Sequence, residues 1–287
     1  MRRLLITGGS GYLGQHLIAH AGDAHAAEWE VIATYHARPF APARGAAVGL
    51  DLRDEAATRA VVADVKPQVI LHTACSNRNA EHQAAIVPAA QHIARAAREH
   101  NLHLVHVSSD VVFDGEHPPY GDDAQPGPVT EYARAKAEAE AGVAEACPGA
   151  VIARPSLIWG LDPIDHQTRW LVEAVRAARP VTLFTDEFRC PTYVHDLCDA
   201  LLELAARPEL SGPINLVGPQ RLSRWAFGMK LLAALNISAD SYVRASTVKE
   251  SRLARPRDLT LTTARAQREL KTRLRAVDEV LGQSGRC

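Results

Sequence analysis

The chain has 287 residues, of which 47% are hydrophobic and 23% are charged, and this composition supports an ordinary core in one large domain or in a main domain with a smaller one. Its 32 basic and 33 acidic side chains give a formal net charge of −1, which argues against nucleic acid as the main partner. No apolar stretch approaches the roughly 18 residues that a membrane span needs, and the apolar run near the N-terminus is too short for a signal peptide.

The cysteines are five in number and show no C-x-x-C spacing. An odd number without paired spacing is typical of a reducing compartment rather than of a disulfide framework. We therefore expect free thiols and a cytoplasmic protein. The cysteines are Cys75, Cys147, Cys190, Cys198 and Cys287.

Short apolar runs alternate with alanine-rich stretches through the first half of the chain. The predicted strands are 4–6, 31–33, 48–50, 69–71, 102–107 and 150–153, and the predicted helices are 12–21, 55–65, 80–100 and 131–146. Near-continuous apolar strands separated by helices imply a parallel sheet that is covered on both faces. We predict an α/β fold with a Rossmann-type, doubly wound parallel sheet in residues 1–154.

The alternation loosens after about residue 154, where prolines become frequent. Helical pieces at 170–178, 194–206 and 224–235 alternate there with brief extended segments. We predict that residues 155–287 form a smaller C-terminal cap that binds the substrate. One late strand, Pro213–Val217, is expected to rejoin the main sheet.

The stretch TGGSGYLG, at Thr7–Gly14, lies between the first predicted strand and the first predicted helix. Its G-x-G-x-x-G spacing allows a tight turn, close approach of the backbone to a pyrophosphate and close packing of helix on strand. The pyrophosphate would lie at the helix N-terminus, where free N–H groups favour an anion. The predicted cofactor contacts in this turn are Gly8, Gly9, Ser10, Gly11, Tyr12, Leu13 and Gly14.

The end of the second strand indicates which dinucleotide is bound. A site that prefers NAD places a carboxylate there, and the segment Thr34–Arg38 contains none. Arg38, assisted by His36, suits a 2′-phosphate, so we predict NADP (NADPH) and consider NAD the weaker alternative. The ends of the third and fourth strands supply the remaining predicted contacts in this region, which are Asp51, Leu52, His72, Thr73 and Ala74.

Tyr132 and Lys136 are four residues apart on a predicted helix, so their side chains project from one face. An ammonium beside a phenol stabilises the phenolate and lowers the pKa of the phenol, and the same ammonium can hold ribose hydroxyls. Upstream, Ser109 follows the fifth strand at its carboxyl end, where open α/β sheets bind ligands. We predict that Ser109, Tyr132 and Lys136 are catalytic and that Tyr132 and Lys136 also contact the cofactor.

His100, His103 and His106 repeat every three residues. Alternate residues of a strand face opposite sides, so these three histidines cannot share one face. We predict no metal site.

Six motifs occur in the order expected of an extended short-chain dehydrogenase/reductase: TGGSGYLG, SSDVVFDG, YARAK, RPSLIWG, PTYVHDL and RPRDLTL. The later motifs resemble the dTDP-4-dehydrorhamnose reductase branch most. The resemblance covers nearly the whole chain, and it implies a Ser109/Tyr132/Lys136 triad with serine where that branch commonly has threonine. Two departures concern His72–Ala74, where the branch often has Asn-Ala-Ala, and Arg255–Leu259, where an asparagine and a serine usually follow the Arg-Pro pair.

The resemblance also implies that residues 154–160, 189–192 and 252–257 face a nucleotide sugar. We place Arg154 among the cofactor contacts and consider Arg154, Arg189 and Arg255 candidates for neutralising the diphosphate. The predicted reaction is reduction of a ketone by NADPH, at C4 of a dTDP-4-keto-6-deoxy sugar, and the sequence is compatible with a homodimer. The predicted substrate contacts are Ser109, Asp110, Trp159, Arg189, Thr192 and Arg255.

Two other functions stay open at this point. One is a redox-neutral epimerase or dehydratase with bound NAD, which is disfavoured because no acid follows the second strand and because Val111, not an acid, follows Asp110. The other is a non-catalytic NADP-binding regulatory subunit, like the regulatory subunit of methionine adenosyltransferase. The intact Tyr132 and Lys136 argue against the second.

Overall fold

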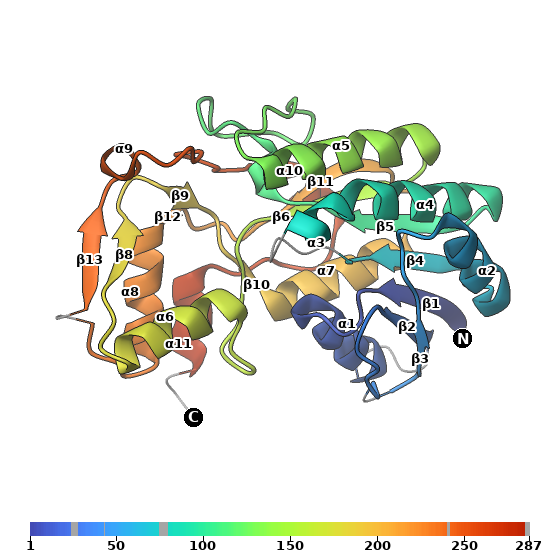
Figure 1. The fold of residues 1–287 in the computed structure, drawn as a ribbon, viewed down its shortest axis with the longest axis horizontal. Helices are drawn as coiled ribbons and strands as arrows, with labels where there is room; N and C mark the ends of the chain where they lie inside the picture. Colours follow the sequence, from blue (N-terminus) through green and yellow to red (C-terminus); the bar gives the residue numbers. More distant parts are fainter. Residues whose placement is uncertain (24–27, 43, 75–79, 240–241, 285–287) are drawn as a thin grey trace.

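A computed structural model gives the structure of residues 1–23, 28–42, 44–74, 80–239 and 242–284. Within these ranges, one sheet of seven parallel strands has the order β11-β6-β5-β4-β1-β2-β3 (Figure 1). This order confirms the predicted doubly wound α/β fold, and it includes the late strand. The strands are β1 (Arg2–Thr7), β2 (Trp29–Tyr35), β3 (Ala46–Gly49), β4 (Val69–His72), β5 (His103–Val107), β6 (Val151–Pro155) and β11 (Gly212–Leu216).

Helices cover both faces of this sheet. Leu5, Ile70 and Leu104 pack under one helical layer, and Leu4, Leu71 and Val105 pack under the other. The first layer is α2 (Glu55–Val65), α4 (Ile86–Glu99) and α5 (Glu131–Ala146), and the second is α1 (Tyr12–Asp23), α7 (Val194–Ala206) and α10 (Ala264–Glu269). Segments α7, β11 and α10 follow residue 154 and still complete the main sheet and its cover.

The predicted helix 80–100 is two helices in the structure, α3 (Ala80–Ala84) and α4. The interruption at Ala85 has a local cause, because Pro88 lacks the N–H that would bond the carbonyl of Ala84 and its ring crowds that carbonyl. The prediction of one continuous helix was therefore wrong.

Most of the remaining elements after β6 form a smaller region, seen at the left of Figure 1. Its two principal clusters pack α6 and α8 against a parallel pair of strands, β8 and β13, and pack α8 against α11. The elements are β7 (Ile158–Trp159), α6 (His166–Arg176), β8 (Val181–Phe184), β9 (Phe188–Arg189), β10 (Thr192–Tyr193), β12 (Leu222–Ser223), α8 (Arg224–Ala234), β13 (Val243–Ser246), α9 (Val248–Ser251) and α11 (Val277–Ser284).

Two further predictions concern cysteines and membranes. Cys147, Cys190 and Cys198 are buried free thiols, whereas Cys75 and Cys287 lie outside the described residues. No helix in the described ranges combines the length and the apolar character that crossing a bilayer requires.

A histidine cluster joins α1 to α7. His20 bridges Asp199 and His195 through its two ring nitrogens, at 2.9 and 2.7 Å. The ring of His16 lies edge-on to that of His195, with centroids 5.1 Å apart. Burial, together with the neighbouring histidines, lowers the pKa of His16 to about 4.

This cluster predicts a loss of stability in acid. Between about pH 6.5 and about pH 4 the unfolded chain binds a proton that the folded His16 excludes, so the free energy of unfolding decreases as the pH falls. Over that window the wild-type protein should lose on the order of 2 kcal/mol more than the variant His16→Phe. Urea unfolding at a series of pH values measures the difference. The control is His100→Phe at an exposed position, which should lose as much stability as the wild type over the same pH range. If the free energy of unfolding falls equally steeply with pH in wild type and in His16→Phe, His16 is not the residue responsible.

Candidate functional site

The glycine turn between β1 and α1 is packed so tightly that side chains are excluded from it. A Cβ placed on Gly9 would lie 2.6 Å from the Cβ of Ala33, and one on Gly14 would collide with the carbonyl of Gly8. Gly8 itself has φ of +72° and lies directly against the backbone of Ala74. A Cβ placed on Gly11, in contrast, would contact only the carbonyl oxygen of Gly8, at 3.2 Å.

The arrangement around this turn suits a dinucleotide. Ser10 and Gly11 are exposed just before α1 begins at Tyr12, so backbone N–H groups of the helix start are available to a pyrophosphate. Leu13 packs into the core between α1 and the sheet. Thr73 fixes the end of β4 by donating its hydroxyl to the carbonyl of Thr7 at 2.7 Å.

The residues after β2 and β3 form a charged rim at the same edge of the sheet. Arg38 is exposed and makes no ion pair in the described part of the chain. Nε2 of His36 lies 3.5 Å from Oδ2 of Asp51, and hydrogen bonds from Arg53 lower the pKa of Asp51 to about 2. Leu52 is buried in the core, so only its backbone is available to a cofactor.

The predicted catalytic residues come from β5 and α5. Lys136 is 1% exposed, and its Nζ donates to the carbonyl of Val107, the last residue of β5, at 2.8 Å. Ser109 follows two residues later and donates its hydroxyl to Oδ1 of Asp110 at 3.1 Å. Tyr132 lies one turn before Lys136 on α5 and is partly buried against the same core. The hydrogen bond of Lys136 therefore ties the helix that carries Tyr132 to the strand end that leads to Ser109.

The start of α5 explains this placement. Thr130 caps the helix by accepting the N–H of Ala133 at 3.2 Å, which places Tyr132 in the first turn. The helix packs against the short 3-10 helix η1 (Asp110–Val112) that follows Ser109. Tyr132 and Ser109 therefore lie on neighbouring segments at the carboxyl edge of the sheet.

A buried charge network lies next to Ser109. Asp110 is 2% exposed and accepts from Ser156 at 2.6 Å and from Arg189 at 3.3 Å. Arg189 also donates to Glu187 at 3.2 Å, and Arg255 donates to the other oxygen of Glu187 at 2.8 Å. The structure thus links Asp110, Arg189 and Arg255, three of the predicted substrate contacts, and the side chain of Arg255 is 43% exposed.

Three predicted contacts have structural roles in this geometry. Arg154 is a buried residue of β6 that makes a bidentate ion pair with Glu140 of α5 and donates to the carbonyl of Asp122, so its guanidinium is not available to a cofactor or a diphosphate. Trp159 is 1% exposed and belongs to a hydrophobic cluster. Thr192 donates to the carbonyl of Leu216.

Comparison with known proteins agrees with this architecture. The family model described as RmlD substrate binding domain matches residues 1–284. The chain belongs to that family. One similar curated protein is methionine adenosyltransferase 2 subunit beta of Xenopus laevis, which is 30% identical over 260 residues, or 86% of this chain and 75% of the relative. A probable dTDP-4,6-dihydroxy-2-methyloxan-3-one 4-ketoreductase of Streptomyces antibioticus is 28% identical over 74% of this chain and 70% of the relative.

Two solved structures share the fold. A dTDP-4-dehydrorhamnose reductase from Clostridium acetobutylicum matches with a TM-score of 0.82 at 20% identity, covering 98% of both chains. The dTDP-4-dehydrorhamnose reductase from Bacillus anthracis, solved in complex with NADP, matches with a TM-score of 0.81 at 21% identity over 99% of this chain and 98% of that one. The family resemblance predicted from the sequence motifs is confirmed.

Sequence reasoning missed one residue that organises this candidate site. Glu187 is 1% exposed and holds Arg189 and Arg255 together. Its position two residues before Arg189 places both side chains on the same side of an extended segment, which is a signal that the sequence contains.

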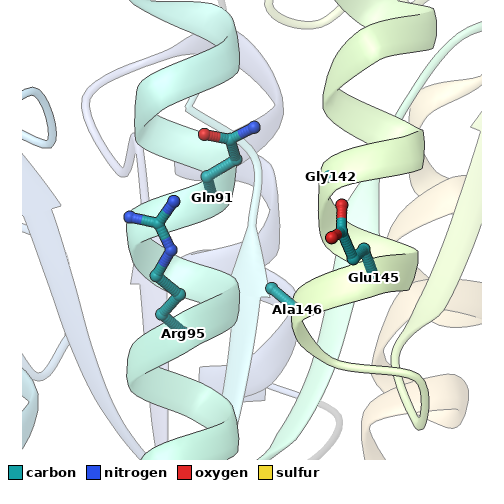
Figure 2. Close-up of a pocket in the computed structure, with 5 residues that line it drawn as sticks. All are labelled: Gln91, Arg95, Gly142, Glu145 and Ala146. Carbon is teal, nitrogen blue, oxygen red and sulfur yellow. The ribbon is translucent and has the colours of Figure 1, made fainter.

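Away from this edge, a cavity of about 290 Å³ lies between α4 and α5. Figure 2 shows its lining, which is Gln91, Arg95, Gly142, Glu145 and Ala146. Gly142 is nearly two helical turns beyond Lys136, and the lining has no pair of groups suited to acid–base chemistry. We therefore assign the candidate site to the carboxyl edge of the sheet.

Proposed function

We propose that this RmlD-family chain binds NADPH and reduces a ketone, with C4 of a dTDP-4-keto-6-deoxy sugar as the substrate position. The observation that carries the proposal is that Lys136 is buried and donates a hydrogen bond to the carbonyl of Val107. Lys136 is one helical turn from Tyr132, and Val107 is two residues from Ser109. In this proposal an ammonium, a phenol and a hydroxyl act together at the edge of the sheet that also presents the glycine turn.

In this proposal the nicotinamide cofactor supplies a hydride to the ketone carbon when it is bound. Tyr132 donates a proton to the oxygen of the former ketone, so the carbonyl becomes an alcohol. Lys136 stabilises the phenolate that remains and holds ribose hydroxyls. Ser109 donates a hydrogen bond to the same oxygen, for which its hydroxyl turns away from Asp110.

The substrate side depends on the network around Glu187. Arg189 is enclosed by Asp110 and Glu187, whereas Arg255 reaches solvent while it keeps one contact to Glu187. Arg255 is therefore the better placed of the two for a diphosphate, and Arg189 holds the segment in place. The Streptomyces antibioticus relative, a probable ketoreductase of a dTDP sugar, supports this substrate class.

A regulatory role is the second candidate, and a specific observation favours it. Methionine adenosyltransferase 2 beta subunits from several vertebrates match this chain at 26–30% identity over 84–86% of its length. In such a role the chain binds the dinucleotide and acts on a partner enzyme, and the Tyr132 hydroxyl is not required.

One experiment separates these candidates. Purified protein is mixed with NADPH and a panel of dTDP-, UDP- and GDP-linked 4-keto sugars, with NADH as the comparison. We expect NADPH oxidation with a dTDP sugar. No oxidation with any sugar, together with a methionine adenosyltransferase that co-purifies and changes activity when the chain is added, would replace the reductase proposal by the regulatory one.

Cofactor preference gives a separate prediction. Arg38→Ala should weaken NADPH binding by about 10- to 100-fold, because a guanidinium–phosphate pair is lost, and should change NADH binding by less than about twofold. Fluorescence titration with both nucleotides measures the two affinities. Arg44→Ala, another exposed arginine in the following loop, is the control. An equal loss for both nucleotides would contradict recognition of the 2′-phosphate by Arg38.

A further inference from the structure

Two histidines form a stacked pair inside the sheet. In the strand register Thr7 is opposite His72, and His72 is opposite His106. The rings of His72 and His106 stack with centroids 5.2 Å apart and planes inclined by 23°, and the Thr7 hydroxyl lies 2.7 Å from Nδ1 of His72. Each histidine is 2% exposed.

This pair lies under the helical layer that includes α5. Two residues earlier on their strands, Ile70 and Leu104 belong to the same hydrophobic cluster as Val143 of α5, and alternate residues of a strand share a face. The pair therefore faces this layer, and Nζ of Lys136 reaches the carbonyl of Val107, the residue after His106. Burial and the nearby charge of Lys136 both lower the pKa of His72, to about 3, and the pKa of His106, so both rings are neutral at physiological pH.

The pair is costly to the fold. Both ring nitrogens of His106 and the hydroxyl of Ser108 are buried without a hydrogen-bond partner in the described part of the chain. A buried polar group in this condition costs about 1–3 kcal/mol, and an apolar side chain of similar size at position 106 would avoid that cost. A cost of this kind at the carboxyl edge of the sheet points to a function of the pair.

We propose that His72 and His106 are positioning residues for Lys136, which stabilise its buried ammonium at the cofactor edge of the sheet. A charge removed from water needs polar surroundings, and two neutral imidazoles supply dipoles and lone pairs on the side of α5 that faces the sheet. Thr7 fixes the His72 ring, and the stack fixes His106. The inference rests on the proposed function only in assigning cofactor contact to Lys136.

The direct test observes the lysine and does not need a cofactor. The chain has five lysines, so protein labelled with ¹³C at lysine Cε gives few signals, and Lys136→Met identifies the one from Lys136. In His106→Leu the titration of the Lys136 signal should move to lower pH by about one unit or more, because apolar surroundings disfavour the charged form. The melting temperature should stay unchanged or rise, since an unpartnered polar group has been removed.

His103→Leu is the matched control, because His103 lies on the same strand and contacts the carbonyl of Leu204 in α7, on the opposite face. It should leave the Lys136 signal unchanged. His72→Leu should reproduce the effect of His106→Leu, and His106→Asn, which keeps a polar group, should restore part of it. A Lys136 titration that is the same in wild type and in both leucine variants would overturn the proposal and leave the pair a purely structural one.

NADPH affinity gives the second measurement. His106→Leu should weaken NADPH binding by about tenfold. The same substitution in a Lys136→Met background should have no further effect, and an equal loss in both backgrounds would show that His106 does not act through Lys136. If wild-type protein binds no NADPH, the proposed function fails, while the lysine titration still decides the present inference.

Discussion

The variant Tyr132→Phe should lose NADPH-dependent ketone reduction by about 10²- to 10⁴-fold, the usual contribution of a positioned proton donor. The substitution removes one oxygen and retains the ring that packs against the core beside α5, so the fold should persist. NADPH affinity should change by less than about tenfold, because Lys136 and the glycine turn keep their predicted contacts with the cofactor and only the hydroxyl of Tyr132 is lost. Steady-state oxidation of NADPH with the best sugar of the panel, and fluorescence titration of NADPH, measure the two quantities.

Tyr242→Phe provides the control for this prediction. Tyr242 lies beside β13 in the smaller region, and its side chain reaches solvent, so removal of its hydroxyl should leave both rate and affinity unchanged. If Tyr132→Phe folds, binds NADPH and still reduces the ketone at the wild-type rate, Tyr132 is not the proton donor.

The helices of the main domain were predicted best where the chain carries its own boundary signals. The structure places α2 and α5 at 55–65 and 131–146, as expected, with Asp54 and Thr130 capping their first turns. α6 was predicted to begin at residue 170, where its apolar face becomes evident, and it begins at His166. The earlier signal was Asp165, which accepts the N–H groups of Gln167 and Thr168.

The candidate site could be predicted where its residues are close in the sequence, and not where they depend on distant partners. The glycine turn and the Tyr132/Lys136 pair are each contained in a few residues, and the structure places both at the carboxyl edge of the sheet. The stacking of His72 on His106 requires β4 to pair with β5, a register that no local pattern contains. The role of Arg154 likewise depends on a partner that lies on a different element.

The ion pair of Arg154 with Glu140 gives the second large prediction, which concerns the stability of the fold. Arg154 and Glu140 are each 5% exposed at the side chain and are joined by hydrogen bonds of 2.7 to 3.2 Å, and the guanidinium also lies over the ring of Phe113. Glu140→Leu leaves a buried guanidinium without its counter-charge, so it should lower the free energy of unfolding by about 3–5 kcal/mol. Urea unfolding followed by circular dichroism measures the loss.

The double variant Glu140→Leu/Arg154→Leu shows whether that loss comes from the uncompensated charge of Arg154 or from altered packing of the leucine side chain. Replacing both charges removes the desolvation penalty together with the attraction, so the double variant should be more stable than Glu140→Leu alone. The ion pair between the exposed Arg273 and the half-buried Glu279 is the control. Arg273→Ala should lower the free energy of unfolding by less than about 1 kcal/mol, because solvent screens this pair. If Glu140→Leu costs no more than Arg273→Ala, the guanidinium reaches water, and Arg154 returns as a candidate for binding the diphosphate.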